Sequence, residues 1–177
     1  MGETFVEMLL NNMMTLLPFV IIMSYEGGVR WTLGRNPREL KPGFHWKWWF
    51  FHQIERMSVV DQVIELQIQS VITQDGELVC FSVNIGFHIV DVVAHFCGVQ
   101  DFIESTRALA MTHLAKEVRK KPYQDLVTDL SKLERSLQGT LTTRLKDWGT
   151  EIFSVGFTNF AKVPLQVRIF GDSSVHI

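Results

Sequence analysis

The strongest pattern in the sequence is the alternation of apolar and polar residues between residues 57 and 91. The residues predicted to share one buried strand face are Ile64, Leu66, Ile68 and Ile72. Asp75-Gly76 follows, a dipeptide typical of tight hairpin turns. From Val79 to Ile89 every second residue is apolar again. The pattern predicts a long antiparallel hairpin with one buried face.

Shorter strand signals precede this hairpin. Val29 to Leu33 alternates as a strand after a glycine turn, residues 34–41 are polar and predict a loop, and Pro42-Gly43 predicts a second turn. Residues 44–51 then carry an unusual density of aromatic rings. They fit a strand buried on one face or an anchor at a membrane interface. We favour the anchor, because so many bulky rings cannot all pack on one face of a small core.

The C-terminal half has helical periodicity. Residues 101–120 carry an apolar stripe with His113 on it, which predicts a helix with a half-buried, hydrogen-bonded histidine. A second stripe consists of Leu126, Leu130, Leu133, Leu137, Leu141, Leu145 and Trp148. We expect its helix to pack on a sheet, with a capping box at Ser131 and Glu134 and a stop at Gly149. Residues 152–160 predict a final strand.

The N-terminus is apolar but short. Met8 to Met23 contains no charged residue, yet as a helix it would extend only about 24 Å, less than the ~30 Å of a bilayer core. It fits a marginal span, a membrane-embedded hairpin, an interfacial helix, or a buried core helix. We expect Pro18 to end the helix and residues 19–23 to continue as an extended or short apolar piece. The predicted membrane-anchoring residues are Phe5, Met8, Leu9, Met13, Leu16, Leu17, Phe19, Val20, Ile21, Ile22, Trp46, Trp48, Trp49 and Phe50.

Charge is distributed unevenly along the chain. No Lys or Arg precedes Arg30, whereas several follow it closely, so a spanning segment would leave the domain in the cytoplasm. The net charge of −2 gives no indication of nucleic-acid binding. Cys80 and Cys97 have neither metal-knuckle nor redox spacing, and we expect two free thiols.

The search for chemistry yields no catalytic residue, metal ligand set or cofactor motif. His88, His95 and Cys97 are the nearest approach to a metal site, but their spacing matches no closed zinc site. Asp75 is predicted to be a turn residue. We therefore expect no enzymatic activity and no cofactor.

Several short motifs occur in a telling order: LGR at Leu33–Arg35, LKPGFHW at residues 40–46, TQDGE at residues 73–77, an aspartate at position 91, and WG at residues 148–149. Together they resemble the SPFH (Band 7) domain of stomatin, prohibitin and flotillin across residues 25–171. The motif residues are Leu33, Gly34, Arg35, Pro42, Gly43, His45, Asp75, Gly76, Asp91, Trp148 and Gly149.

The resemblance implies an α+β fold: a membrane-anchoring segment (1–24), a strand-rich lobe (25–95), a lobe of helices packed on a small sheet (96–171) and a tail (172–177). It implies a membrane-associated scaffold that oligomerises side by side into a ring or cage, and the Lys/Arg asymmetry described above places its domain on the cytoplasmic side. Such a scaffold organises a membrane microdomain or partner membrane proteins, a membrane protease among them. The alternative is a soluble structural subunit of a large assembly, such as a viral one, that reuses the fold.

Two features depart from the family pattern. Trp48 and Trp49 stand where the family usually has prolines, which leads us to expect deeper membrane contact or the covering of a neighbour. The long charged coiled-coil helix that usually follows the domain is not found before Ile177. We therefore do not expect these residues to build a tall domed cage.

Overall fold

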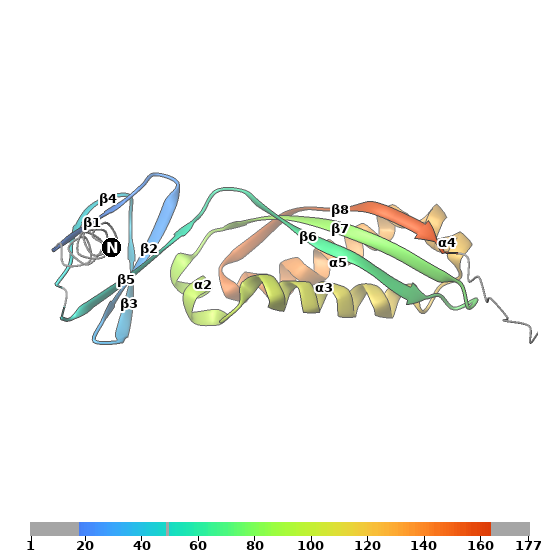
Figure 1. Ribbon diagram of the computed structural model, residues 1–177, viewed down its shortest axis with the longest axis horizontal. Coiled ribbons are helices and arrows are strands. Elements are labelled where there is room, and N and C mark those ends of the chain that lie inside the picture. The colour runs from blue at the N-terminus through green and yellow to red at the C-terminus, as the bar shows by residue number, and fades with distance from the viewer. Residues whose placement is uncertain (1–17, 49, 164–177) are drawn as a thin grey trace, which may run out of the picture.

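The computed structural model describes residues 18–48 and 50–163, and residues 1–17, 49 and 164–177 lie outside the described part of the chain. The described residues form an elongated molecule with two lobes arranged along its length (Figure 1). The first lobe consists of strands and loops, and the second contains a three-stranded sheet and helices. The α+β fold class expected from the sequence is confirmed.

The first lobe holds a strand pair and a three-stranded sheet. β1 (Phe19–Ile22) pairs with β4 (Gly43–Trp46), and β2 (Glu26–Thr32) pairs with both β3 (Arg35–Leu40) and β5 (His52–Ser58), all antiparallel. The predicted loop at residues 34–41 is therefore wrong, because most of it is strand β3. β3 lies at the edge of its sheet and exposes most of its side chains, so a polar sequence is compatible with this strand.

The predicted long hairpin forms the first two strands of the second lobe. β6 (Gln62–Ile72) and β7 (Leu78–Ile89) are antiparallel, and β8 (Thr150–Lys162) pairs with the other side of β7. β7 is thus the central strand, and its odd-numbered apolar residues from Val79 to Ile89 are all buried. Their alternation in the sequence reflects burial against the helices on one face only.

The register of the β6–β7 hairpin shifts between Leu66 and Gln69. Before the shift, Ile64 and Leu66 are 5% and 1% exposed; after it, Val71 is buried and Ile72 is 58% exposed. A bulge inserts one residue and moves the following side chains to the opposite face. The prediction that Ile72 shares a buried face with Ile64 and Leu66 is therefore wrong.

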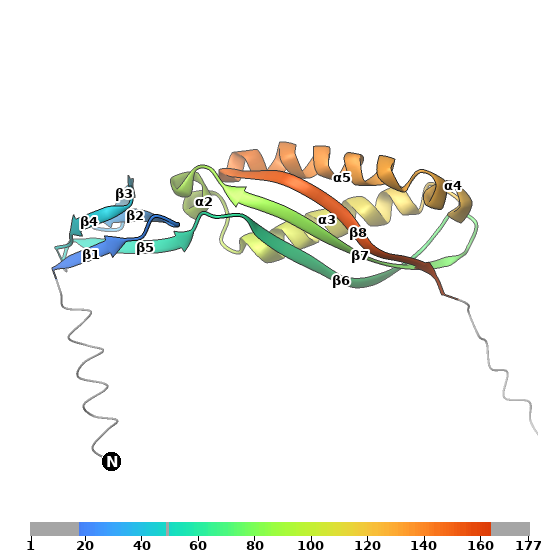
Figure 2. The same cartoon turned by 90° about the horizontal axis from the view of Figure 1, so that it is seen from above.

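Helices cover one face of the second sheet (Figure 2). The long ones are α3 (Phe102–Val118) and α5 (Leu130–Leu145), and the short ones are α2 (Val92–Gly98), α4 (Tyr123–Thr128) and the 3-10 helix η1 (Lys146–Trp148). α3 begins after Asp101, whose Oδ1 accepts the N–H of Glu104 at 3.0 Å. Both long helices predicted from the sequence are confirmed.

The leucine stripe packs on the sheet, as predicted. Leu126 and the four leucines from Leu133 to Leu145 are buried in the main core. The predicted capping box is wrong, because α5 already begins at Leu130 and Ser131 lies inside it. The Glu134 carboxylate instead accepts the N–H of Phe157 at 3.0 Å, beside a register shift between β7 and β8.

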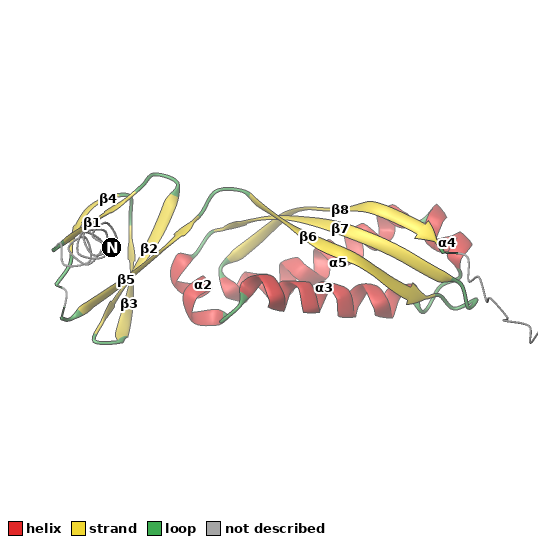
Figure 3. Ribbon diagram, viewed as in Figure 1, coloured by secondary structure: helices red, strands yellow, loops and turns green. Residues whose placement is uncertain are grey.

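The division between the lobes differs from the expected one. The β6–β7 hairpin shares its core with α3 and α5, so the change of lobe falls in the loop between β5 and β6 rather than at residue 95 (Figure 3). α2 connects the lobes, since its Val92 forms a buried cluster with Val29 of β2 and Ile89 of β7. The sequence pattern identifies these segments as strands, but it does not show which strands share a hydrophobic core.

The LGR motif forms the tip of the β2–β3 hairpin. Leu33 and Gly34 have positive φ values of 52° and 69°, and Leu33 is 70% exposed. A left-handed conformation costs a non-glycine residue about 1–2 kcal/mol, and Asn tolerates it better. We therefore expect Leu33→Asn to raise the free energy of unfolding by roughly 0.5–1 kcal/mol, measured as a higher urea midpoint. A lower midpoint would show that the leucine side chain makes a contact worth more than the strain.

Candidate functional site: an aromatic face and the motif residues

Four large apolar side chains lie on one face of the β1–β4 pair. Phe19 is directly opposite Trp46, and Ile21 is directly opposite Phe44. Opposed residues of an antiparallel pair, and residues two apart along a strand, point to the same side. These side chains are 38%, 53%, 48% and 63% exposed in that order, and the rings of Phe19 and Phe44 stack with centroids 5.4 Å apart. We call these four residues the aromatic face.

The opposite face of the same strand pair is turned toward the lobe. Ile22 is 2% exposed and packs beside Gly28, Val20 is half-buried, and His45 Nε2 lies 2.6 Å from the carbonyl oxygen of Lys41. The prediction that Ile22 is a membrane-anchoring residue is therefore wrong. The alternation of β1 places it in the core of the lobe, whereas Phe19 and Ile21 remain accessible.

The turn after β4 continues the exposed aromatic surface. Trp48, Phe50 and Phe51 are 59%, 71% and 51% exposed. The carbonyl of Trp48 accepts the N–H groups of Phe51 at 3.0 Å and His52 at 2.8 Å, so the backbone holds these rings at the surface. Phe44 and Phe51 belong to the aromatic run at residues 44–51 for which an interfacial anchor is predicted, although the individually named anchoring residues do not include them. Phe44 stands two residues from Trp46 on β4 and therefore shares its face.

The remaining anchoring predictions lie outside the described residues. They concern Phe5, Met8, Leu9, Met13, Leu16, Leu17 and Trp49. Across residues 18–48 and 50–163, none of the helices combines the length and apolar character needed to cross a membrane. The anchoring role of the N-terminal segment stays a prediction.

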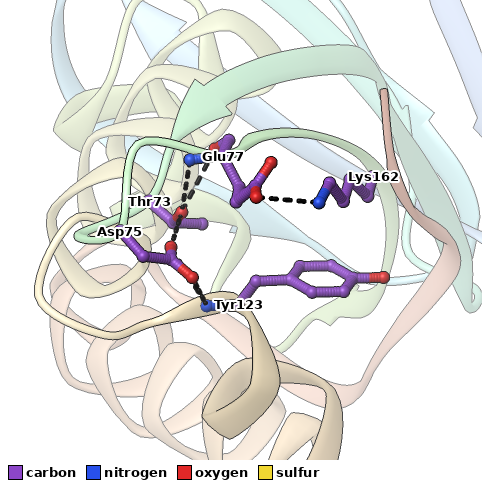
Figure 4. A network of polar contacts seen from close by, with 5 residues as sticks. All are labelled: Thr73, Asp75, Glu77, Tyr123 and Lys162. Carbon is purple, nitrogen blue, oxygen red and sulfur yellow. Dashed lines mark hydrogen bonds and ion pairs between the residues drawn. The ribbon is translucent and has the colours of Figure 1, made fainter. Parts of the chain in front are cut away.

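The TQDGE motif forms a polar network (Figure 4) at the turn between β6 and β7, which lies at the end of the second lobe away from the first lobe (Figure 1). Thr73 Oγ1 donates to the Asp75 carboxylate and accepts the N–H of Glu77 at 3.1 Å. Asp75 also accepts the N–H of Tyr123 at 3.2 Å, and Glu77 pairs with Lys162 of β8 at 2.8 Å. The Thr73 hydrogen bond is the main cause that lowers the pKa of Asp75. Asp75 therefore ties the hairpin turn to the first residue of α4.

Asp91 and the Trp148-Gly149 motif, which are 57 positions apart in the sequence, meet where the lobes join. Asp91 caps α2, since its Oδ1 accepts the N–H of Ala94 at 2.9 Å. The Gly149 carbonyl accepts the N–H groups of Val90 and Asp91 at 2.8 and 3.0 Å. Gly149 has a φ of 62°, and a Cβ there would overlap the Asp91 carbonyl oxygen. The motif residues hold the junction, and glycine is required for this close approach.

His95 is buried at the same junction. Its Nδ1 lies 3.0 Å from Thr150 Oγ1, whose hydroxyl donates to the carbonyl of Trp148 at 3.2 Å. The hydroxyl oxygen can thus accept a hydrogen bond from Nδ1–H of a neutral imidazole. Burial lowers the pKa of His95, and a hydrogen bond with the Trp148 backbone opposes that effect.

This burial predicts a pH dependence of stability. As pH falls through the ordinary pKa of histidine, the unfolded chain takes up a proton at His95, whereas the folded protein resists protonation there because its pKa is lower. The free energy of unfolding therefore falls as the pH drops below the ordinary pKa of histidine, and it is not reduced by this group above that pKa. We expect the urea midpoint to fall less between pH 7.5 and pH 5 in His95→Gln than in the unaltered protein. Equal falls would contradict the assignment.

The other candidate residues do not gather into one site. His88 lies with Nδ1 3.6 Å from Asp61 and Nε2 3.6 Å from Glu151, so the two carboxylates face opposite ring nitrogens. Cys97 is exposed. In the described ranges, three or more His, Cys, Asp or Glu residues nowhere group closely enough to hold a metal ion. His113, as predicted, is half-buried and hydrogen-bonded, at 3.1 Å from Ser136 Oγ.

Comparison with known proteins places this fold. The family described as SPFH domain / Band 7 matches residues 20–161. A stomatin homologue of Pyrococcus horikoshii is 25% identical over 135 residues, which cover 76% of this chain and 51% of the relative. Stomatin-like protein 1 of Mus musculus is 22% identical over 132 residues, covering 75% and 33%. The chain thus spans about half or less of the length of these two relatives. Because the match extends over most of the chain and includes the motifs described above, the chain belongs to the SPFH domain / Band 7 family.

Proposed function

We propose that this protein is a membrane-anchored SPFH scaffold whose copies assemble side by side into a ring or cage that organises a membrane microdomain or partner membrane proteins. The observation that carries the membrane part is the aromatic face with Trp48, Phe50 and Phe51 beside it. The strands that carry the aromatic face, β1 and β4, lie at one end of the elongated molecule (Figure 1). In the sequence, β1 lies in the last part of the apolar stretch from Met8 to Met23.

An exposed apolar surface of this kind indicates a partner surface. Monomeric soluble proteins rarely expose contiguous apolar patches larger than a few hundred Å². Tryptophan favours the headgroup region of a bilayer, because its ring is largely apolar but carries a polar N–H group. We therefore infer that the first lobe lies on the bilayer, and that the Lys and Arg residues after Tyr25 hold it on the cytoplasmic side.

The second lobe offers a surface for assembly. The helices cover one face of its sheet, and none of the described elements covers the other (Figure 2). That face includes exposed Val63, Ile72 and Phe153. Within the described part of the chain β6 and β8 are also edge strands, which leaves backbone groups available to a neighbour. These features support side-by-side packing, a role that requires contact surfaces rather than a catalytic centre.

Vesicle flotation of the full chain tests the membrane part of the proposal. We expect the protein to float with vesicles that carry phosphatidylserine, and to do so at high salt because aromatic burial is not screened. A protein that stays at the bottom of the gradient as a large lipid-free particle would support the alternative, a structural subunit that buries the aromatic face between copies.

A further inference from the structure

A groove of about 570 Å³ runs between α3 and α5 on the second lobe. The two helices are antiparallel: Phe102, at the start of α3, contacts Trp148 just after α5, and farther along His113 meets Ser136. The groove is far from the aromatic face, at the other lobe. It is therefore open to a partner whether or not the first lobe lies on a membrane.

The floor of the groove is apolar, and the side chains at its rim are small. Leu109, Leu141 and Trp148 supply the apolar part, and α3 contributes Ala108 and Thr112 at the rim. Small side chains on both helices let a third backbone approach closely. This combination suits a helix that lays an apolar stripe into a groove.

Charge in the groove has one sign. Lys116 and Arg144 are exposed lining residues, and the lining residues include no Asp or Glu. In the described chain neither cation forms an ion pair, whereas their neighbours Arg107, Lys120 and Lys132 each pair with a carboxylate one turn away. The groove therefore presents two cations that have no ion-pair partner among the described residues.

The two cations lie at opposite ends of the groove. Eight residues back along α3 from His113 is Ser105, and eight residues forward along α5 from Ser136 is Arg144, so Arg144 lies level with Ser105. Lys116 is eleven residues from Ser105 on α3, which corresponds to roughly 16 Å along the helix. A partner helix lying parallel to the groove would span that distance in about three turns.

We propose that this groove binds an amphipathic helix of a partner protein, one that places carboxylates about eleven residues apart, against Lys116 and Arg144, and an apolar stripe between them. The apolar floor supplies affinity through burial, and the two charges fix the register and the orientation of the helix. An isolated phosphate or lipid headgroup would use the cations but leave the floor uncovered.

The test uses the full chain in lipid nanodiscs and a fluorescein-labelled 15-residue helical peptide. The peptide carries Glu at positions 2 and 13, Leu at positions 5, 6 and 9, and otherwise Ala and Gln. We expect saturable binding by anisotropy, with a dissociation constant below about 100 μM. Lys116→Glu/Arg144→Glu should weaken binding at least tenfold, and Lys116→Gln/Arg144→Gln should weaken it less. Exchanging the two Glu of the peptide for Lys should restore binding to the charge-reversed protein.

The matched control is Arg119→Glu/Arg135→Glu, which makes the same change in charge outside the groove and should alter binding less than twofold. Equal weakening by both double variants would overturn the proposal, as would the absence of saturable binding below about 1 mM. A peptide with Ser in place of its three Leu that binds equally well would also overturn it, since the groove would then be a simple anion site. Vesicle flotation of the same variants should not change, so failure here leaves the scaffold proposal separately testable.

Discussion

Serine at Phe44, Trp46 and Trp48 is expected to weaken vesicle binding by about 100-fold in a chain that lacks residues 1–17. Each of these aromatic side chains is more than half exposed, which corresponds to roughly 100 Å² of the 150–250 Å² that an aromatic residue can bury. Full burial at about 25 cal/mol per Å² would contribute ~2.5 kcal/mol per residue. At an interface the burial is partial, so we take ~1 kcal/mol for each, and three such losses correspond to about two decades in affinity.

The truncated background is needed because the N-terminal apolar segment would otherwise retain the variant on the membrane. A control variant replaces Val60, Ile103 and Val127 by serine; these residues are 48–49% exposed but lie off the aromatic face. We expect its partition coefficient, measured by vesicle sedimentation, to match that of the truncated parent. If the aromatic variant also matched the parent, the aromatic face would not be a membrane contact, and burial between subunits would become the better account.

Alanine at Gly149 is expected to lower the free energy of unfolding by at least about 3 kcal/mol. The positive φ alone costs an L-residue about 1–2 kcal/mol. The added methyl group would also overlap the Asp91 carbonyl oxygen and lie 2.9 Å from Asp91 Cβ and 3.0 Å from Ala94 Cβ. Relief of that overlap would pull apart the hydrogen bonds that Val90 and Asp91 donate to Gly149. A loss of this size is a large share of the stability of a typical domain.

The matched control is Gly156→Ala on β8, where a Cβ would meet no atom within 4 Å. We expect that variant to change the urea midpoint by less than the equivalent of ~1 kcal/mol. The same urea midpoint in both variants would show that the junction between Asp91 and Gly149 accommodates the methyl group without loss of stability. The WG motif would then need an explanation other than the joining of the lobes.

Much of the fold could be predicted because its signals are local. The alternation from Val79 to Ile89 identifies β7 without any partner, since one face of that strand is buried throughout. The leucine stripe identifies the buried face of α5 for the same reason. The family motifs mark turns and a helix start, so residues such as Gly76 and Gly149, both with positive φ, could be assigned a backbone role from sequence.

The parts that failed depend on partners distant in sequence. The bulge near Leu66 arises from pairing with β7, so Ile72 could not be assigned to a face from its own strand. β3 is polar because it lies at a sheet edge, and nothing local distinguishes it from a loop. Glu134 bonds Phe157 rather than its own helix start, which only the packing of α5 on β8 reveals.

The candidate surfaces could be predicted only in part, because local patterns show their residues but not which side chains the fold brings together. The aromatic run after Gly43 was visible in the sequence, but which rings point outward follows from the pairing of β1 with β4. The cationic groove needed the antiparallel arrangement of α3 and α5, because Lys116 and Arg144 are 28 positions apart and belong to different helices. The meeting of Asp91 with Gly149 likewise required the fold.

The central claim is that this chain assembles on a membrane, and the mass of the particle extracted directly into lipid nanodiscs tests it most directly. We predict a particle that contains many copies of the full chain together with bilayer lipid. Its protein mass, after subtraction of lipid, divided by 20.4 kDa gives the number of copies. A particle that holds one or two copies would contradict the scaffold account, while leaving the fold and the family assignment unchanged.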